Sequence, residues 1–302
     1  MSIITRITSI FSKPKSSDVI GIALRQHSVA FFAKKETENQ CDAIENKALP
    51  VASTLKTLVS EHEFSGQCHL VLSNTQSQIV QVDRPTVPDA EINAALKWQI
   101  KDLVSIAPDN MVLDYFDGPV LAGGLEKINV VCAAKNELIE LVTLLTTDDM
   151  SVGSITTEEF AFASLLPIQQ DAILLVCQQP NEEINLLIIK NGQLFFSRRL
   201  RGFSQIANKN EMDLTSGTID ALSLEIQRST DYFERQLKQA PIKTIEVLVP
   251  MANEAFLARK LAENTNVEVK LFEMPSLLEN EREKAVAIAA TALNFMEPEA
   301  NG

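Results

Sequence analysis

Apolar residues along the chain fall into short runs of strand length, separated by longer segments in which they recur every three or four positions. The short runs, rich in Val, Ile and Phe, predict β-strands, and the wider spacing predicts amphipathic helices. Such an alternation in two similar halves predicts an α/β protein with mixed sheets. The expected strands are 19–22, 28–33, 69–72, 79–82, 111–116, 128–133, 173–177, 184–189, 194–199, 245–249 and 267–271, and the expected helices are 51–62, 136–145, 217–239, 254–264, 283–295 and one that begins at Thr86.

A strand–turn–strand unit occurs twice, in residues 18–34 and again in residues 171–200. Each copy opens with an aspartate followed by an apolar strand, and the two aspartates, Asp18 and Asp171, are 153 residues apart. The second copy contains an Asn-Gly turn, which is a strong hairpin signal. Two such hairpins, each leading an α/β half, are typical of a duplicated fold that closes on a nucleotide. The polar segment 36–46 after the first hairpin is interpreted as a loop.

Composition narrows the class of protein. At 302 residues and 45% hydrophobic content, the chain has enough apolar surface for two domains. A formal charge of −13, with no basic stripe, makes nucleic acid an unsuitable partner. The cysteines are far apart and form no Cys-x-x-Cys pair, so we expect buried, reduced thiols and no metal. They are Cys41, Cys68, Cys132 and Cys177.

The first 17 residues form a basic segment with its own pattern. No apolar run approaches the roughly 20 residues needed to cross a bilayer, and no secretory signal is present, so we expect a cytoplasmic protein. Ile3, Ile7 and Phe11 nevertheless recur at helical spacing, with Arg6 and Lys13 nearby. This pattern predicts a short amphipathic helix that contacts a membrane surface or a partner. The alternative is a frayed terminus without a role.

Five motifs, in order and spacing, resemble those of the PilM-type pilus assembly proteins. The longest is a helix that carries Trp98 and is followed by an acidic loop and a strand ending in Leu-Asp-Tyr. Within the family, the short basic N-terminus and the loose nucleotide motifs look most like the branch that builds the mannose-sensitive haemagglutinin (MSHA) type IV pilus. The motifs lie at residues 88–100, 108–115, 131–135, 158–161 and 224–233.

The resemblance implies an actin-like, two-domain fold of RNase H type, with a small α+β subdomain inserted in the first domain. The basic segment would occupy residues 1–17, and a tail would follow the second domain at 297–302. The expected domains are 18–66 with 149–167 for the first, 67–148 for the insertion and 168–296 for the second.

The resemblance also implies a scaffold that lies in the cytoplasm and associates peripherally with the inner membrane. PilM-type proteins bind the cytoplasmic N-terminus of a single-span, PilN-type pilus protein. They also help to couple the assembly platform to its motor ATPase. We therefore expect a membrane-anchored partner of this type. The groove between the first domain and the insertion is the expected place of binding.

The resemblance further identifies the positions that would hold nucleotide, and they lack the required residues. The first hairpin of actin-like proteins reads roughly Gly-x-Asp-x-Gly, whereas Ala23 replaces the aspartate here and Arg25 the second glycine. The second hairpin has Leu175 and Cys177 where an Asp-Ile-Gly is expected, and Pro250 stands in the glycine-rich purine loop. Because glycines let backbone N–H groups approach phosphates, we expect a pseudo-ATPase with no catalytic residues and no cofactor. Mg-ATP would bind only if the degenerate site retains affinity.

Three features leave alternatives open. Arg25 is either a solvated turn residue or the centre of an anion pocket. The cluster Arg198, Arg199 and Arg201 is either a solvated strand end or a docking point for an acidic segment or phospholipid head groups. Trp98 lies off the face formed by residues 92, 96 and 100, so it is either a core residue or a partner-binding residue.

Other function classes also remain open. An active ATPase with unusual site residues predicts stabilisation by nucleotide. A type II secretion scaffold would continue into a transmembrane helix, whereas this sequence stops at Gly302, so the pilus hypothesis is preferred. A homo-oligomer or filament is the third alternative.

Overall fold

The protein divides into two compact units. In the computed structural model, the first unit extends to Ala161 and resumes at Val286, and the second is built from Phe162–Ala285. The C-terminal helix therefore belongs to the first unit, whereas the sequence placed it in a second domain of residues 168–296. The structure describes residues 16–36, 38–47, 49–118 and 126–292.

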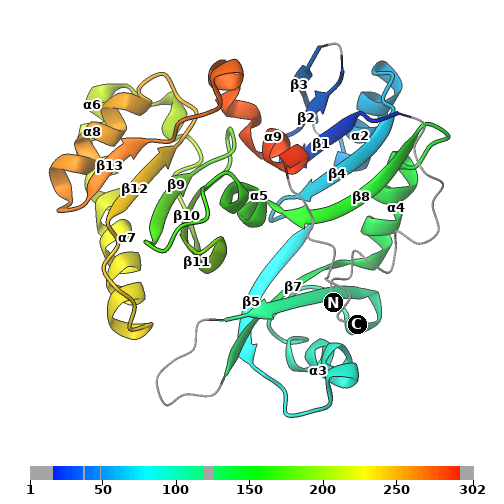
Figure 1. The fold of residues 1–302 in the computed structure, drawn as a ribbon, viewed down its shortest axis with the longest axis horizontal. Coiled ribbons are helices and arrows are strands. Elements are labelled where there is room, and N and C mark those ends of the chain that lie inside the picture. The colour runs from blue at the N-terminus through cyan, green and yellow to red at the C-terminus, as the bar shows by residue number, and fades with distance from the viewer. Residues whose placement is uncertain (1–15, 37, 48, 119–125, 293–302) are drawn as a thin grey trace. The chain divides into compact units, whose positions relative to one another are not determined.

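The first unit is organised around a mixed sheet of five strands in the order β3-β2-β1-β4-β8 (Figure 1). β1, β2 and β3 form an antiparallel meander, and β4 and β8 run parallel to β1. The strands are β1 (Val19–Leu24), β2 (Ser28–Lys34), β3 (Gln40–Glu45), β4 (Gly66–Leu72) and β8 (Met150–Thr157).

The third strand corrects the sequence interpretation, which treated 36–46 as a loop. β3 pairs with β2 from Ser28 opposite Glu45 to Ala33 opposite Gln40. It is an edge strand, and none of its side chains is fully buried. An edge strand of this kind needs few apolar residues, so its composition resembles that of a loop.

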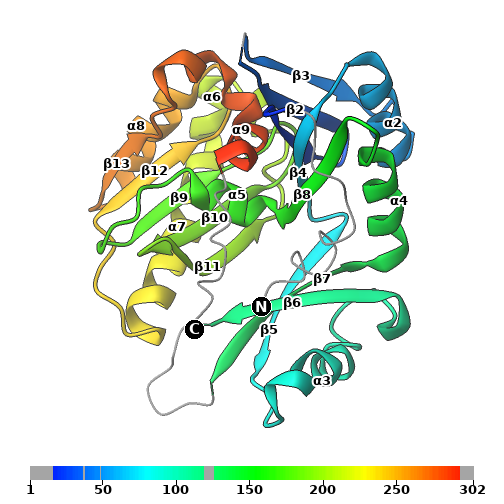
Figure 2. The same ribbon diagram turned by 45° about the vertical axis from the view of Figure 1, so that its right-hand side comes forward.

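The two faces of the first sheet bury different side chains. Ile20, Ile22 and Leu24 of β1 belong to the core formed with α2 (Val51–Glu61) and α4 (Lys135–Leu145), helices that lie side by side in Figure 2. Gly21 faces the opposite way, toward α9 (Ala285–Ala292). A Cβ at Gly21 would collide with the backbone carbonyl of Ala287. The small residues of β1 and α9 therefore permit close packing of helix on strand.

A second, smaller sheet is inserted in this unit. Its antiparallel strands follow the order β5-β7-β6, and α3 packs on one face through Ile92, Leu96 and Ile100. The helix start is preceded by Pro88 and not capped by Thr86, and α3 ends at Gln99. The elements are β5 (Ser77–Asp83), η2 (Asp89–Glu91), α3 (Ile92–Gln99), η3 (Pro108–Asn110), β6 (Met111–Asp117) and β7 (Lys127–Ala134), and α5 (Glu158–Ser164) follows β8.

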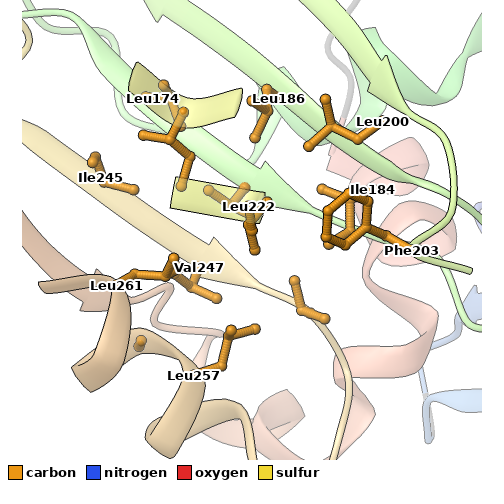
Figure 3. Close-up of a cluster of buried hydrophobic side chains, with 14 of the residues drawn as sticks. Leu174, Ile184, Leu186, Leu200, Phe203, Leu222, Ile245, Val247, Leu257 and Leu261 are labelled. Atoms are coloured by element: carbon orange, nitrogen blue, oxygen red, sulfur yellow. The ribbon is translucent and has the colours of Figure 1, made fainter. Parts of the chain in front are cut away.

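The second unit repeats the topology of the first. Its strands follow the order β11-β10-β9-β12-β13, with an antiparallel meander and two parallel strands. Figure 3 shows the core, in which Leu174 and Ile245 of the sheet meet Leu222 and Leu257 of the helices. The elements are β9 (Ile173–Cys177), β10 (Ile184–Lys190), β11 (Gln193–Leu200), η4 (Ile206–Asn208), α6 (Glu211–Asp213), η5 (Leu214–Thr218), α7 (Ile219–Asp231), η6 (Tyr232–Gln236), β12 (Thr244–Leu248), α8 (Glu254–Asn264), β13 (Glu268–Leu271) and η7 (Ser276–Lys284).

The predicted duplication is confirmed, with a shift of one residue. Ile20 and Ile22 face the helices in the first unit, as Leu174 and Val176 do in the second. Ile20 and Leu174 are 154 residues apart, and so are Ile22 and Val176, whereas Asp18 and Asp171 are 153 residues apart. Since a slip of one residue turns every side chain to the other face of a sheet, the leading aspartates are not equivalent positions.

Candidate functional site: an apolar groove in the first unit

A largely apolar groove lies where the inserted sheet meets the main sheet of the first unit. It has a volume of ≈ 210 Å³. The inserted sheet contributes the face opposite α3, including Val112 of β6 and Val131 of β7, and the main sheet contributes Leu72 and the end of β8. Phe160 of α5 closes one side, with its ring edge-on to Phe116 at 5.0 Å between centroids.

Two strand edges border this groove. β6 is an outer strand of the inserted sheet, and β8 is an outer strand of the main sheet. Residues 112–116 of β6 and 154–157 of β8 all line the groove. An outer strand has one edge that is not paired within its sheet. Such edges offer backbone N–H and C=O groups to an added strand.

A few polar groups interrupt the apolar lining. The Asp114 carboxylate accepts the N–H of Tyr115 at 2.9 Å. Thr157 is 3% exposed, and its Oγ1 has no hydrogen-bond partner. Buried hydroxyls normally have one, so this atom is suited to bond with an occupant of the groove.

Ser154 connects the groove to a buried histidine. Its Oγ lies 2.7 Å from Nδ1 of His69 on β4. Burial lowers the pKa of His69 to about 4, because a charged imidazole loses its hydration there. The ring is therefore neutral at neutral pH, and it supports Ser154 by a hydrogen bond without placing a charge beside the groove.

The turn after β1, residues 25–27, contains no glycine, and Arg25 is its one buried residue. Ala23 is fully buried and pairs with Ala30 and Val71. Arg25 is 3% exposed, so the interpretation of Arg25 as a solvated turn residue is wrong. Its backbone N–H donates to Ser28 at 2.9 Å, which closes the turn.

The corresponding turn of the second unit is also filled by its own side chains. Leu175 and Cys177 are fully buried, and the thiol of Cys177 donates to the carbonyl of Asn185 at 3.6 Å. The next residue, Gln178, donates its side-chain amide to the carbonyls of Glu182 and Phe203, at 2.6 and 3.0 Å.

The loop that contains Pro250 is held by a buried ion pair. Glu254, at the start of α8, accepts the backbone N–H of Val249 at 2.7 Å. Its two carboxylate oxygens receive Nε and Nη2 of Arg282, at 2.7 and 2.8 Å. Burial raises the pKa of Glu254, and the bonds from Arg282 and Val249 oppose this rise. A backbone donor of the loop is thus already occupied by the protein itself.

Other structures share this arrangement of sheets. The PilM–PilN type IV pilus biogenesis complex matches with a TM-score of 0.68 and 14% identity, over 92% of this chain and 98% of that one. The cytoplasmic domain of EpsL, an inner membrane component of the type II secretion system of Vibrio cholerae, gives 0.54 and 11%, over 92% and 97%. A Bacteroides thetaiotaomicron protein with an actin-like ATPase fold and unknown function gives 0.53 and 11%, over 97% and 99%. The fold is actin-like.

At these identities the likeness shows the fold and no more. No protein-family model matches the chain, and no curated protein matches it in sequence. The actin-like, two-domain fold expected from the sequence is thus confirmed. Of the positions that the sequence placed at a nucleotide site, Arg25 and Pro250 lie in turns, Cys177 ends β9, and Ala23 and Leu175 lie within β1 and β9.

The exposed tryptophan was not resolved by sequence reasoning. Trp98 is 67% exposed, so the interpretation of Trp98 as a core residue is wrong. It lies on the side of α3 away from the inserted sheet and does not line the groove. The groove itself was expected, but no residue was assigned to its lining. Asp114, Val131 and Phe160 lie in three of the five motifs, whereas Leu72 and Thr157 carry no distinguishing sequence signal.

The remaining candidates are placed as follows. Ile3, Ile7 and Phe11 lie outside the described residues. Arg198, Arg199 and Arg201 border a second hollow, in the second unit, where Arg198 pairs with Glu225 at 3.1 Å.

The thiols add little to the chemistry. Cys68 and Cys132 are buried as expected, and burial raises the pKa of Cys132 to about 11. Among the described residues, no His, Cys, Asp and Glu cluster suits a metal ion. No helix in that part of the chain has the length and apolarity to span a membrane.

Proposed function

We propose that this protein is a scaffold of type IV pilus biogenesis, equivalent to MshI of the MSHA pilus, and that its groove holds the N-terminus of a PilN-type inner-membrane protein. The observation that carries the proposal is the apolar groove bordered by the edges of β6 and β8. A groove of this kind suits an extended peptide, which adds main-chain hydrogen bonds and buries alternate side chains. The fold shared with the PilM–PilN complex supports this choice of partner.

The lining defines the chemistry of the peptide. Val112, Val131 and Phe116 require apolar side chains at positions that face the inserted sheet. Asp114 favours a basic residue nearby. Thr157 offers its unpaired hydroxyl to a polar group of the peptide. The expected ligand is a short, apolar and basic segment in extended conformation.

Binding this segment would hold the protein at the cytoplasmic face of the inner membrane. The basic residues of the segment 1–17 would add peripheral contact with anionic lipid. From this position the scaffold would connect the membrane-anchored partner to the pilus motor ATPase, without chemistry of its own.

Peptide titration tests the proposal. The wild-type protein should bind the N-terminal peptide of its PilN-type protein in isothermal titration calorimetry. Val131→Gln places a polar side chain in the groove and should weaken binding by at least about tenfold, which corresponds to about 1.4 kcal/mol. Ile79→Gln is the matched control, because Ile79 lies opposite Val131 on β5 but outside the groove lining. Equal affinity of Val131→Gln and wild type would contradict the groove assignment.

A scaffold of a type II secretion system is the second candidate, favoured by the shared fold with EpsL. The same titration separates the two functions. Peptides from the inner-membrane proteins of a type II secretion system should not bind measurably. Binding of one of these peptides, with no binding of any pilus peptide, would replace the pilus assignment.

We also propose that the protein is a pseudo-ATPase. The support is local: each turn that should approach nucleotide is closed by its own side chains. Gln178 and Glu254 occupy backbone groups of the second unit, and Arg25 is buried at the turn of the first. Neither ATP nor Mg²⁺ has a role in this function.

A further inference from the structure

The outer surface of α3 carries an apolar projection. Trp98 is the single tryptophan of the chain and is 67% exposed, and Leu103, just beyond the helix end, is 58% exposed. Isolated exposed apolar residues are common, but tryptophan is enriched among the residues that carry the binding energy of interfaces. We call Trp98, Leu103, Lys97 and Lys101 the α3 knob.

The lysines make the knob basic. Nζ of Lys101 lies 5.9 Å from the centroid of the Trp98 ring, within the range of a cation–π contact. Lys97 precedes Trp98 on the same helix. The knob is thus an aromatic side chain with two lysines and one exposed acidic neighbour, Asp102, on a chain whose net charge is −13. A complementary surface would be an apolar hollow with negative charge nearby.

The groove of the first unit has these properties. It is largely apolar, has a volume of ≈ 210 Å³, and includes the Asp114 carboxylate in its lining. The knob and the groove are therefore both largely apolar, and their charged residues are of opposite sign. We propose that Trp98 of one copy of this chain enters the groove of a second copy, with Lys97 and Lys101 near Asp114.

The direction of the two surfaces determines the kind of assembly. α3 packs on one face of the inserted sheet through Leu96 and Ile100. The groove uses the residues of β6 and β7 that point to the other face, such as Val112 and Val131. A knob and a groove on opposite faces cannot meet within one chain. Successive copies therefore join head to tail, which leaves a free knob at one end and a free groove at the other.

This self-association is weak and is opposed by the partner peptide. A contact made by one tryptophan and its neighbours buries much less area than the ~1,600 Å² of a standard interface. We therefore expect a Kd on the order of 10⁻⁵–10⁻⁴ M. The groove holds either a peptide or a knob, so peptide binding prevents a further copy from joining the assembly. The proposal does not rest on the pilus assignment, because it needs only this protein.

Sedimentation velocity over a concentration series tests the inference. The wild-type sedimentation coefficient should rise with concentration, and the emission of Trp98 should move to shorter wavelength as the ring leaves water. Trp98→Ala and Val131→Gln should each stay monomeric. Met212→Ala is the control, since Met212 is a large exposed side chain outside the knob and groove, and it should associate like wild type.

Mixing the two inactive variants gives the decisive result. Val131→Gln retains an intact knob, and Trp98→Ala retains an intact groove. Together they should form a 1:1 dimer and nothing larger. Monomeric wild-type protein throughout the series, or association that persists in Trp98→Ala, would overturn the inference. Failure is distinguishable from failure of the proposed function, because Trp98→Ala should still bind the partner peptide while Val131→Gln loses both activities.

Discussion

Burial changes the chemistry of individual side chains, and His69 is the clearest case. Its imidazole is buried in β4 and bonded to Ser154 at 2.7 Å. Burial lowers its pKa from 6.5 to about 4. Between these values the unfolded chain binds a proton that the folded protein excludes. The stability contributed by the neutral ring is thus complete above pH 6.5 and is lost as the pH falls toward 4.

Replacing this histidine should remove part of the acid sensitivity. Between pH 7 and pH 4.5, the free energy of unfolding of wild type should fall by about 2–3 kcal/mol more than that of His69→Gln. Urea denaturation at the two pH values measures the difference. His27→Gln, at an exposed position, should behave like wild type. An equal loss in wild type and His69→Gln would mean that the ring is protonated in the folded state.

At the scale of elements, a few polar contacts decide how a loop is used. Arg282 of η7 reaches β12 and α8, where it bonds both oxygens of Glu254 and the carbonyl of Phe272 at 2.8 Å. The same carboxylate fixes the loop after β12 through Val249. One ion pair thus connects the start of α8, the end of β12 and η7, the segment before α9. Proline at position 250 is tolerated because this loop needs no further backbone donor.

Breaking this ion pair should be costly. Glu254→Gln leaves the partly buried Arg282 without its counter-ion and should lower the free energy of unfolding by about 3 kcal/mol, measured in urea at pH 7. Lys260 and Glu263 provide the control, because they form an ion pair between solvent-accessible side chains of α8. Glu263→Gln should cost less than about 1 kcal/mol. Similar losses of unfolding free energy in both variants would show that the Glu254–Arg282 pair stabilises the protein no more than an exposed ion pair does.

At the scale of the whole molecule, the two units share a duplicated topology but pack their main sheets with different side chains. Both main sheets share one strand order, but Gly21 leaves room for α9 in the first, where Leu175 is a full-sized core residue at the corresponding position of the second. The fold is retained because each sheet still buries one face under helices. The proposal that the protein is a pseudo-ATPase rests on turns that lack the glycines expected for nucleotide binding.

Nucleotide should therefore leave the molecule unchanged. A ligand at one hundred times its Kd would stabilise the folded protein by about 2.7 kcal/mol, which is several degrees in Tm. We expect no rise in Tm with millimolar Mg-ATP in differential scanning fluorimetry. The partner peptide serves as the positive control, since its binding should raise Tm in the same assay. A saturable rise with Mg-ATP would restore the active ATPase as the function.

Prediction from sequence worked where local pattern and structure coincide. The apolar runs of β1, β9 and β12 are buried on both faces, and such strands read as continuous apolar segments. β3 was missed because an edge strand buries little. Leu103 continues the spacing of residues 92, 96 and 100, but α3 ends at Gln99, so Leu103 remains 58% exposed. The periodicity of apolar residues cannot locate the end of a helix, because that end depends on the turn that follows.

The sequence by itself determined the α/β class and the duplication, since each depends on residues close together along the chain, and the loss of nucleotide motifs stays a prediction. Tertiary structure decided the rest. The groove exists because β6 and β8, distant in sequence, end beside each other, and their lining residues have no common local signal. Burial of Arg25 and exposure of Trp98 were decided in the same way. Both depend on which surfaces of the folded chain are covered, and no local pattern contains that information.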